Sequence, residues 1–301
     1  MLFTDWCNAY FLIKQNKVKV STWQNKYFYN YRRYILPMFG ERQIEEIKPY
    51  ELEVFFYSDE VRSKSSAVKQ KLYSLLYGIF QKAYDNDIIS KNPMVAVELP
   101  EYKAVKEKRV YSQAQSDLLY SFCKQHRYGA SIALMLKAGL RRGEVLGLRH
   151  CDVLRKEKLI TVFQAVMEQG GRGVITTPKT GSSVRTLPVS SDLIDFCLSR
   201  ASSGSGDNLL YPNSEGSAVS PHNWHNRQYK VFMDEFTESY PEISALRPHE
   251  LRHTCGTLLY QSGVDIRTIQ KFMGHASIEV TSAIYIHDDV EHMRSALGVD
   301  F

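Results

Sequence analysis

An arginine and an acidic residue sit three positions apart in the segment Gly139-Leu140-Arg141-Arg142-Gly143-Glu144. A glycine that ends one helix and a second helix that begins beside Arg141 would put Arg141 and Glu144 on one face. One interpretation is an arginine positioned by its acidic neighbour to bind an oxyanion. The other is an ordinary surface ion pair, and this segment alone does not decide between them.

A second segment, Pro248-His249-Glu250-Leu251-Arg252-His253, combines a helix start with basic side chains. Proline suits a first helical turn, so His249 and Arg252 become neighbours near a helix N-terminus, where free N–H groups favour an anion. The same residues match H-E-x-x-H, in which His249 and His253 would bind zinc and Glu250 would act as base. Arg252 would then place a cation beside the metal, and the sequence offers no obvious third ligand. The anion interpretation is therefore preferred, with zinc as the alternative.

Two further segments carry reactive side chains that mean little in isolation. Lys179 lies in Thr-Pro-Lys-Thr-Gly, a turn before a strand, where a lysine can swing toward a ligand or simply remain solvated. Gly274 resembles a helix C-cap and is followed by His275. Tyr285 is expected on the next helix. A single histidine or tyrosine in such a place usually has a packing role.

Taken together, these segments occur in the order Arg, Lys, His-x-x-Arg, His, Tyr, and in this order the chain resembles the tyrosine recombinase (phage integrase) family. The matching motifs read GLRRGE, TPKTG, PHELRH, GHAS and Ile-Tyr, and they extend the resemblance over essentially the whole chain. The interval from His275 to Tyr285 is ten residues, as in many integrases of phages and conjugative transposons. The catalytic residues that the resemblance implies are Arg141, Lys179, His249, Arg252, His275 and Tyr285, with Glu144 and His253 in support.

The resemblance implies phosphoryl transfer on DNA without metal, cofactor or ATP. Tyr285 would attack a phosphodiester to form a 3′-phosphotyrosyl link, and His249 is the candidate base, because a phenol is largely protonated at neutral pH. Arg141 and Arg252 would neutralise the pentavalent transition state with always-charged, planar donors. Lys179 would protonate the leaving 5′-oxygen, helped by neighbouring cations that lower its pKa.

The elements that must position these residues are mostly helical. Residues 1–98 show helical apolar spacing and predict a helical bundle, and residues 99–109 predict a basic linker. The resemblance implies that this bundle is a core-type DNA-binding domain of the SAM-like kind. Residues 110–301 predict an α-rich domain with a tail, in which strands near 158–164, 174–177 and 184–189 form one small antiparallel sheet. The resemblance implies that this is the catalytic domain, with the DNA breaking-rejoining enzyme fold. Four lysines are further candidates for DNA contact: Lys64, Lys69, Lys103 and Lys106.

Composition excludes several other classes of protein. The 301 residues are 44% hydrophobic and 24% charged with a net charge of +5, which fits a globular protein with a polyanionic partner. No apolar run reaches the length of a membrane span and no signal peptide is evident, so we expect a cytoplasmic protein without membrane contact. Five scattered cysteines predict neither disulfides nor a thiolate zinc site.

The resulting hypothesis is a site-specific recombinase that integrates and excises a mobile element. Its expected partners are double-stranded recombination sites, three further copies of itself in a tetramer on two synapsed sites, and an accessory or directionality factor. The alternatives are a Xer-type chromosome or phase-variation recombinase, a type IB topoisomerase-like strand transferase, and a DNA-binding regulator with vestigial catalytic residues. The C-terminal segment from Asp288 to Leu297 has an apolar stripe for docking, either on a neighbouring protomer or on its own domain.

Overall fold

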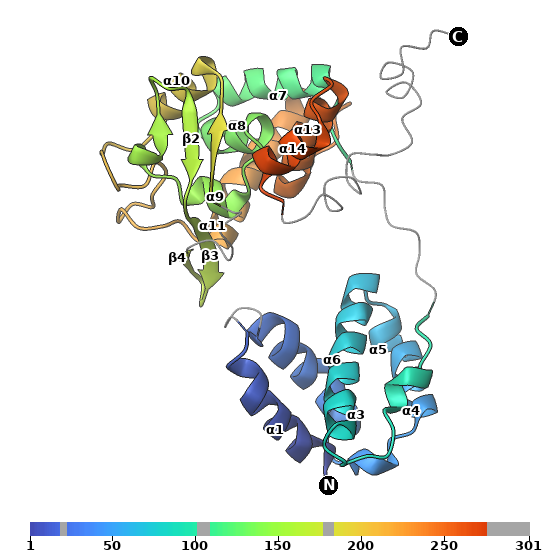
Figure 1. Ribbon diagram of the computed structural model, residues 1–301. Coiled ribbons are helices and arrows are strands. Elements are labelled where there is room, and N and C mark those ends of the chain that lie inside the picture. Colours follow the sequence, from blue (N-terminus) through green and yellow to red (C-terminus); the bar gives the residue numbers. More distant parts are fainter. Residues whose placement is uncertain (19–22, 101–108, 177–183, 276–301) are drawn as a thin grey trace. The chain divides into compact units, whose positions relative to one another are not determined.

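The computed structural model describes residues 1–18, 23–100, 109–176 and 184–275 (Figure 1). Contacts between residues divide the chain into two compact units, 1–106 and 107–301, and each has its own hydrophobic core. The described helices include none that is long and apolar enough to cross a membrane.

The regular elements described in the first unit are all helices, and one isolated β-bridge joins Leu2 to Gln43. The longest helix, α6, forms because its apolar residues recur at helical spacing, and all of Leu72, Leu75, Leu76, Ile79, Phe80 and Ala83 are buried. Helix α1 packs on it, and the Trp6 indole donates a hydrogen bond to the Ile79 carbonyl at 3.0 Å. The helical elements are α1 (Phe3–Gln15), η1 (Trp23–Phe28), η2 (Tyr31–Ile35), α3 (Leu36–Phe39), η3 (Ile44–Glu46), α4 (Pro49–Tyr57), α5 (Asp59–Arg62), α6 (Ser66–Tyr84) and η4 (Pro93–Ala96).

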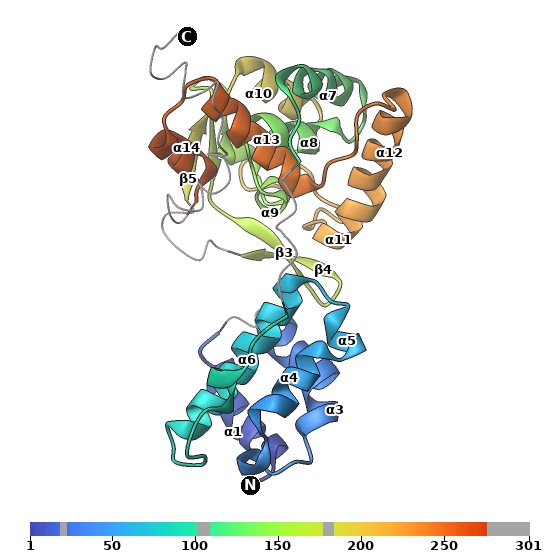
Figure 2. The same cartoon turned by 90° about the vertical axis from the view of Figure 1, so that its right-hand side faces the viewer.

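The second unit is built around α8 (Gly129–Lys137), whose residues up to Leu136 are all buried. A helix that is apolar on all sides must be covered on all sides, and α7, α9, α10 and α13 all contact α8 (Figure 2). The helical elements of this unit are α7 (Gln113–Gln125), α8, α9 (Arg142–Leu146), η5 (His150–Asp152), α10 (Ser191–Ser199), α11 (Pro221–Trp224), η7 (His225–Tyr229), α12 (Lys230–Ser239), α13 (Pro248–Gln261) and α14 (Ile266–Met273).

Strands of the second unit form two small antiparallel sheets. The first has the order β1-β2-β5, with β1 (Val153–Leu154), β2 (Leu159–Val162) and β5 (Arg185–Pro188). The second pairs β3 (Ala165–Gln169) with β4 (Arg172–Thr176) across the Gly170-Gly171 turn. The mainly helical fold with a small antiparallel sheet is as predicted. The prediction that the strand near 174–177 belongs to the same sheet as its neighbours is wrong, because this strand, β4, folds back at the Gly170-Gly171 turn and pairs with β3 in a separate two-stranded sheet. The sequence did not indicate β1 and β3, because β1 has two residues and the end of β3, Glu168-Gln169, is exposed and polar.

Candidate functional site

Glu144 is the centre of the site and is oriented by the start of its own helix. Arg141 is the N-cap of α9 and Glu144 is the third helical residue, so the carboxylate folds back to accept from the Arg141 backbone N–H at 2.8 Å. The other carboxylate oxygen accepts from Arg141 Nη1 at 2.7 Å. The pair predicted from the three-residue spacing is present, and Glu144 is buried.

Arg185 grips the same carboxylate from the β5 strand. Its Nη1 and Nη2 donate to the two Glu144 oxygens at 3.0 and 2.9 Å, and each side chain is only 6% exposed. We assigned Arg185 no role from sequence. A signal did exist: β5 alternates buried and exposed, which places Arg185 on the inward side with Leu187, and an arginine in that position requires a buried acidic partner.

Arg252 reaches this carboxylate from α13. The helix begins with Pro248, as predicted, and its second turn carries Arg252 into the core, where the side chain is 1% exposed. Arg252 Nη1 lies 3.9 Å from Glu144 Oε2 and donates a hydrogen bond to the Gly139 carbonyl. Arg252 Nη2 donates to the Met273 carbonyl. Of the two predicted arginines, Arg141 is the solvent-exposed one, with 37% of its side chain accessible.

The C-terminus of α14 is held by the same three arginines. Arg185 Nε donates to the Phe272 carbonyl at 2.9 Å, Arg252 to Met273, and Arg141 Nη2 to Gly274 at 2.7 Å. The last carbonyls of a helix lack partners within the helix, and the helix dipole favours cations there.

The backbone leaves this helix end through Gly274. The predicted C-cap adopts a left-handed conformation, with φ of 62°. Three consecutive carbonyls and one carboxylate therefore fix three guanidinium groups directly before His275.

The arginine charges lower the pKa of both Glu144 and His275. For Glu144 they act against the effect of burial, and for His275 they act in the same direction as burial. Burial raises the pKa of the Glu144 carboxyl, but the hydrogen bond and charge of Arg185, followed by the charges of Arg141 and Arg252, outweigh burial and lower it to about 2. Burial and then the charges of Arg252 and Arg141 lower the pKa of His275 to about 3. At neutral pH the site therefore holds a carboxylate, three guanidinium groups and a neutral imidazole.

The two histidines of α13 lie beside His275, and both contribute to its low pKa. The His249 and His253 rings are 4.6 Å apart with an edge-to-face orientation, and His249 is exposed whereas His253 is buried. Glu250 instead accepts from the Arg247 backbone N–H and pairs with Arg109. Within residues 1–18, 23–100, 109–176 and 184–275, no group of three potential ligands is arranged to hold a metal ion.

Some predicted residues are not part of this cluster. Lys64 and Lys69 belong to the first unit, where Lys64 Nζ lies 5.9 Å from the Tyr34 ring and Lys69 is in the first turn of α6. Four others fall outside the described residues, namely Lys103, Lys106, Lys179 and Tyr285. The structure thus brings together Arg141, Glu144, Arg252, His249, His253 and His275, from three segments of the chain.

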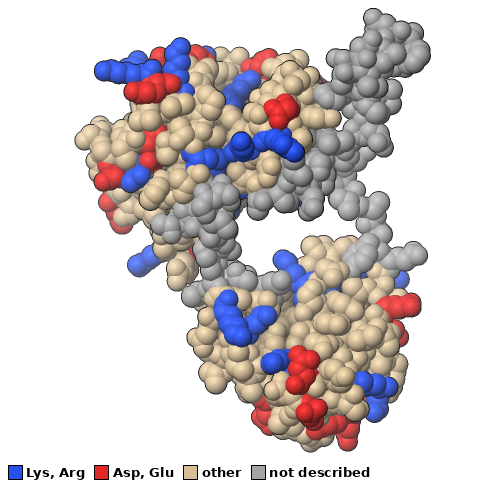
Figure 3. Space-filling model, in the orientation of Figure 1, with Lys and Arg blue, Asp and Glu red and all other residues tan. Residues whose placement is uncertain are grey.

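Basic side chains also gather on the surface near the site. Figure 3 shows a band of Lys and Arg side chains across the part of the second unit where α14 lies, and α14 carries the exposed Arg267 and Lys271. Such a band suits a polyanionic partner.

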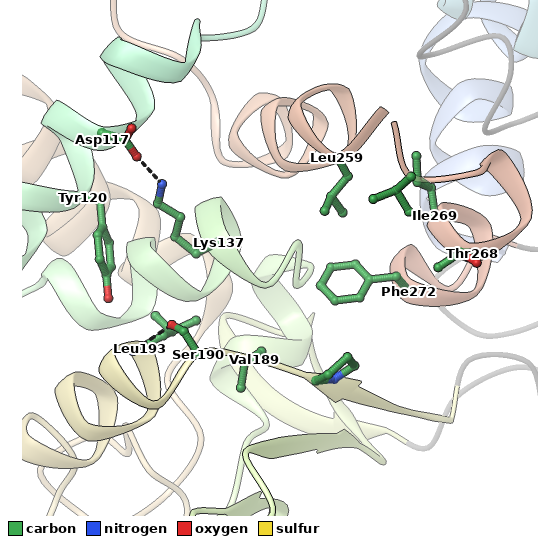
Figure 4. A pocket seen from close by; sticks show the side chains of 12 residues that line it. Asp117, Tyr120, Lys137, Val189, Ser190, Leu193, Leu259, Thr268, Ile269 and Phe272 are labelled. Atoms are coloured by element: carbon green, nitrogen blue, oxygen red, sulfur yellow. Dashed lines mark hydrogen bonds and ion pairs between the residues drawn. The ribbon is translucent and has the colours of Figure 1, made fainter. Parts of the chain in front are cut away.

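An apolar cavity of about 600 Å³ lies between α14 and the elements α7, α8 and α10 (Figure 4). Its wall includes Leu193, Leu259, Ile269 and Phe272, and the ion pair between Lys137 and Asp117, at 2.7 Å, is part of its polar rim. Phe272 is also the residue whose carbonyl accepts from Arg185. The cavity and the arginine cluster therefore share the last turn of α14.

The fold and this arginine cluster agree with the family that the sequence motifs resemble. Residues 109–292 match the phage integrase family, and residues 2–57 match the phage integrase N-terminal SAM-like domain. The chain belongs to the phage integrase family and is a tyrosine-type site-specific recombinase. The resemblance drawn from the motifs is thereby confirmed.

Named relatives and solved structures extend this comparison. The chain is 27% identical to the tyrosine recombinase XerC-like protein of Caldanaerobacter subterraneus subsp. tengcongensis, over 87% of this chain and 73% of that protein. It is also 27% identical to tyrosine recombinase XerD of Rickettsia bellii, over 72% and 73%.

Among solved structures, the Tn1549 transposon integrase in complex with a circular intermediate DNA superposes with a TM-score of 0.85 over 99% of each chain at 21% identity. A lambda integrase tetramer bound to a Holliday junction gives 0.67 over 93% of this chain and 76% of that one, at 17% identity.

Proposed function

We propose that the chain recombines specific DNA sites through a 3′-phosphotyrosyl intermediate formed by Tyr285. The observation that carries this proposal is the convergence of Arg141 and Arg252, which are over 100 residues apart in sequence, on one carboxylate and one helix end beside a neutral His275. The sequence places Tyr285 ten residues after this histidine.

In the proposed reaction, the Tyr285 hydroxyl oxygen bonds to phosphorus and the bond from phosphorus to the 5′-oxygen breaks. The phenol proton passes to His249, the exposed histidine of the cluster, and Lys179 protonates the leaving 5′-oxygen. Arg141 faces the phosphate directly, whereas Arg252 contributes its charge from within the core. Attack by a 5′-hydroxyl reverses the step, so the bond energy is conserved and no ATP is consumed.

His275 is suited to hydrogen bonding with this phosphate rather than to carrying charge. Its pKa of about 3 keeps the imidazole neutral at physiological pH, with one nitrogen as donor and the other as acceptor. The proposed charge stabilisation therefore falls to the arginines, which do the work that a divalent cation performs in other phosphoryl-transfer sites.

A mobile element is the proposed context. The close superposition on a transposon integrase over 99% of the chain favours integration and excision, whereas the XerC and XerD relatives favour a chromosomal role as the second candidate. The test of context is the DNA itself. A mobile-element enzyme recombines the joined ends of the element that carries its gene, and a Xer-type enzyme recombines a single chromosomal or plasmid site.

Covalent trapping tests the chemistry. A binding duplex would first be selected from random sequences with the full chain. A nick near its centre lets the short fragment released by cleavage diffuse away, so that rejoining is prevented and the protein stays attached to the DNA. We expect the native chain to form the adduct and Tyr285→Phe to bind equally well without forming it. Tyr260→Phe, on α13, is the matched control and should keep the adduct.

Each opposing outcome has a distinct meaning. An adduct with Tyr285→Phe overturns the choice of nucleophile, and no adduct with the native chain supports a DNA-binding regulator. Relaxation of plasmids that lack the selected site supports the topoisomerase-like alternative.

Assembly as a tetramer on two synapsed sites is part of the proposal, supported by the lambda integrase tetramer with the same fold. The cavity of Figure 4 is an apolar receptor large enough for side chains such as those of the stripe formed by Val290, Met293 and Leu297. Truncation after His287 tests docking on a neighbour. The truncated chain should bind one site normally and lose cooperative binding to two. Lower thermal stability with unchanged cooperativity would show docking on its own domain.

A further inference from the structure

The buried Arg185 stands apart from the residues that the motifs supply. It is almost inaccessible, with 6% of its side chain exposed, so it offers almost no surface for direct contact with DNA. Yet it donates to both oxygens of Glu144 and to the Phe272 carbonyl, and its side chain packs against Gly274. It therefore touches two of the elements that hold Arg141 and Arg252.

We propose that Arg185 is a positioning residue for the reaction. Its guanidinium shares the negative charge of Glu144, so that net positive charge and the geometry of Arg141 and Arg252 remain available to the phosphate. This inference rests on the proposed function and assigns to it a residue outside the motifs.

Sharing of one carboxylate is the first step of the argument. Both Glu144 oxygens accept from Arg141 and from Arg185, and one of them faces Arg252 at 3.9 Å. Three guanidinium groups around a single carboxylate leave an excess of positive charge. Without Arg185, the same carboxylate would be available to neutralise Arg141 and Arg252 alone, and less charge would remain for the transition state.

Geometry is the second step. The carbonyls of Phe272, Met273 and Gly274 each accept from a different arginine of this set. Arg185 donates to the Phe272 carbonyl and fills the space beside Gly274. These contacts orient the next two carbonyls toward Arg252 and Arg141. Because reacting groups must be held within a fraction of an ångström, a brace one layer below them affects the rate more than the affinity.

Chain connectivity adds a third consequence. Arg185 is the first residue of β5, and the segment between β4 and β5 contains Lys179. The bonds from Arg185 to Glu144 and to the Phe272 carbonyl therefore tie β5, which follows Lys179 in the sequence, to α9 beside Arg141 and to the last turn of α14.

A double-mutant cycle separates charge balance from simple support of the fold. In Arg185→Met, we expect the single-turnover rate of adduct formation on the nicked duplex to fall about 100-fold, while the Kd for that duplex changes less than about threefold. Adding Glu144→Gln removes the carboxylate that Arg185 balanced, and should restore the rate at least about tenfold relative to Arg185→Met. Arg185→Lys, which keeps the charge without the paired donors, should give an intermediate rate.

The matched control breaks another arginine–carboxylate pair of the same unit. Arg149 donates to Asp152 at 2.8 and 3.1 Å, away from the cluster, so Arg149→Met should lower the melting temperature and leave the adduct rate unchanged. The proposal is overturned if the double variant is no faster than Arg185→Met, or if Arg185→Lys is as slow as Arg185→Met.

Two outcomes remain interpretable when the main comparison fails. If Arg185→Met does not fold, the rates of Arg185→Lys and of the double variant against the native chain carry the test, with the same predicted order. If the native chain forms no adduct, the proposed function fails. The melting temperatures of the four proteins in the cycle then still show whether Arg185 and Glu144 are coupled.

Discussion

Substitution of Gly274 by alanine tests the packing of the arginine cluster directly. Gly274 has φ of 62°, and a Cβ atom there would lie 2.9 Å from Arg185 Nη1 and 3.0 Å from its Cδ. Arg185 cannot yield easily, because it is held by Glu144 and by the Phe272 carbonyl. Alanine therefore adds a steric conflict to the conformational cost.

A second glycine isolates the conformational cost. Gly263 follows α13 with φ of 86°, and no atom lies within 4 Å of the position of its Cβ. A left-handed alanine costs about 1–2 kcal/mol, and forcing an extra methyl group into a packed region costs about 1–3 kcal/mol more. We therefore expect Gly263→Ala to destabilise by about 1.5 kcal/mol and Gly274→Ala by about 3.5 kcal/mol.

Differential scanning calorimetry of the full chain measures both variants. For a unit of this size, 1 kcal/mol corresponds to about 2–4 °C, so the melting temperature of the second unit should fall by about 5 °C in Gly263→Ala and about 10 °C in Gly274→Ala. The transition of the first unit should not move, since neither glycine belongs to it. Equal shifts for the two variants would refute the packing of Arg185 against Gly274, and with it the brace on which the further inference depends.

Two other predictions concern His275, which follows α14, and Glu250, the acidic residue in the first turn of α13. The pKa of His275 is about 3 in the folded chain and near 6.5 when unfolded. The unfolded state therefore binds the extra proton, and the free energy of unfolding should fall as the pH decreases from 6.5 toward 3. Urea unfolding at pH 7 and pH 5 should show a smaller loss for His275→Asn than for the native chain, and equal losses would contradict a buried neutral imidazole. Glu250→Gln should keep adduct formation in the presence of a chelator, because Glu250 caps α13 through the Arg247 N–H; loss of activity that zinc restores would revive the H-E-x-x-H interpretation.

Interactions between residues close in sequence determine several features of the site without any long-range contact. The helix starts at Arg142 and Pro248 and the left-handed end at Gly274 follow from glycine, proline and capping chemistry, which act within a few residues. The order of the motifs defined the family, and the spacing of Arg141 and Glu144 predicted their pairing. Such features depend on neighbours in the chain, so the sequence alone expresses them.

Tertiary structure decided what these local features do together. Arg141 donates to a carbonyl 133 residues away, and Arg252 to one 113 residues away, contacts that no local pattern encodes. The same holds for Arg185, whose meaning depends on a carboxylate 41 residues earlier in the chain and on the end of α14. Burial of a charge is tolerated only where partners from distant segments meet it, and those partners become neighbours only when the helices pack around α8. The sequence identifies the reactive side chains. The packing of the folded core determines which of them are charged, which are exposed to solvent and which orient the others.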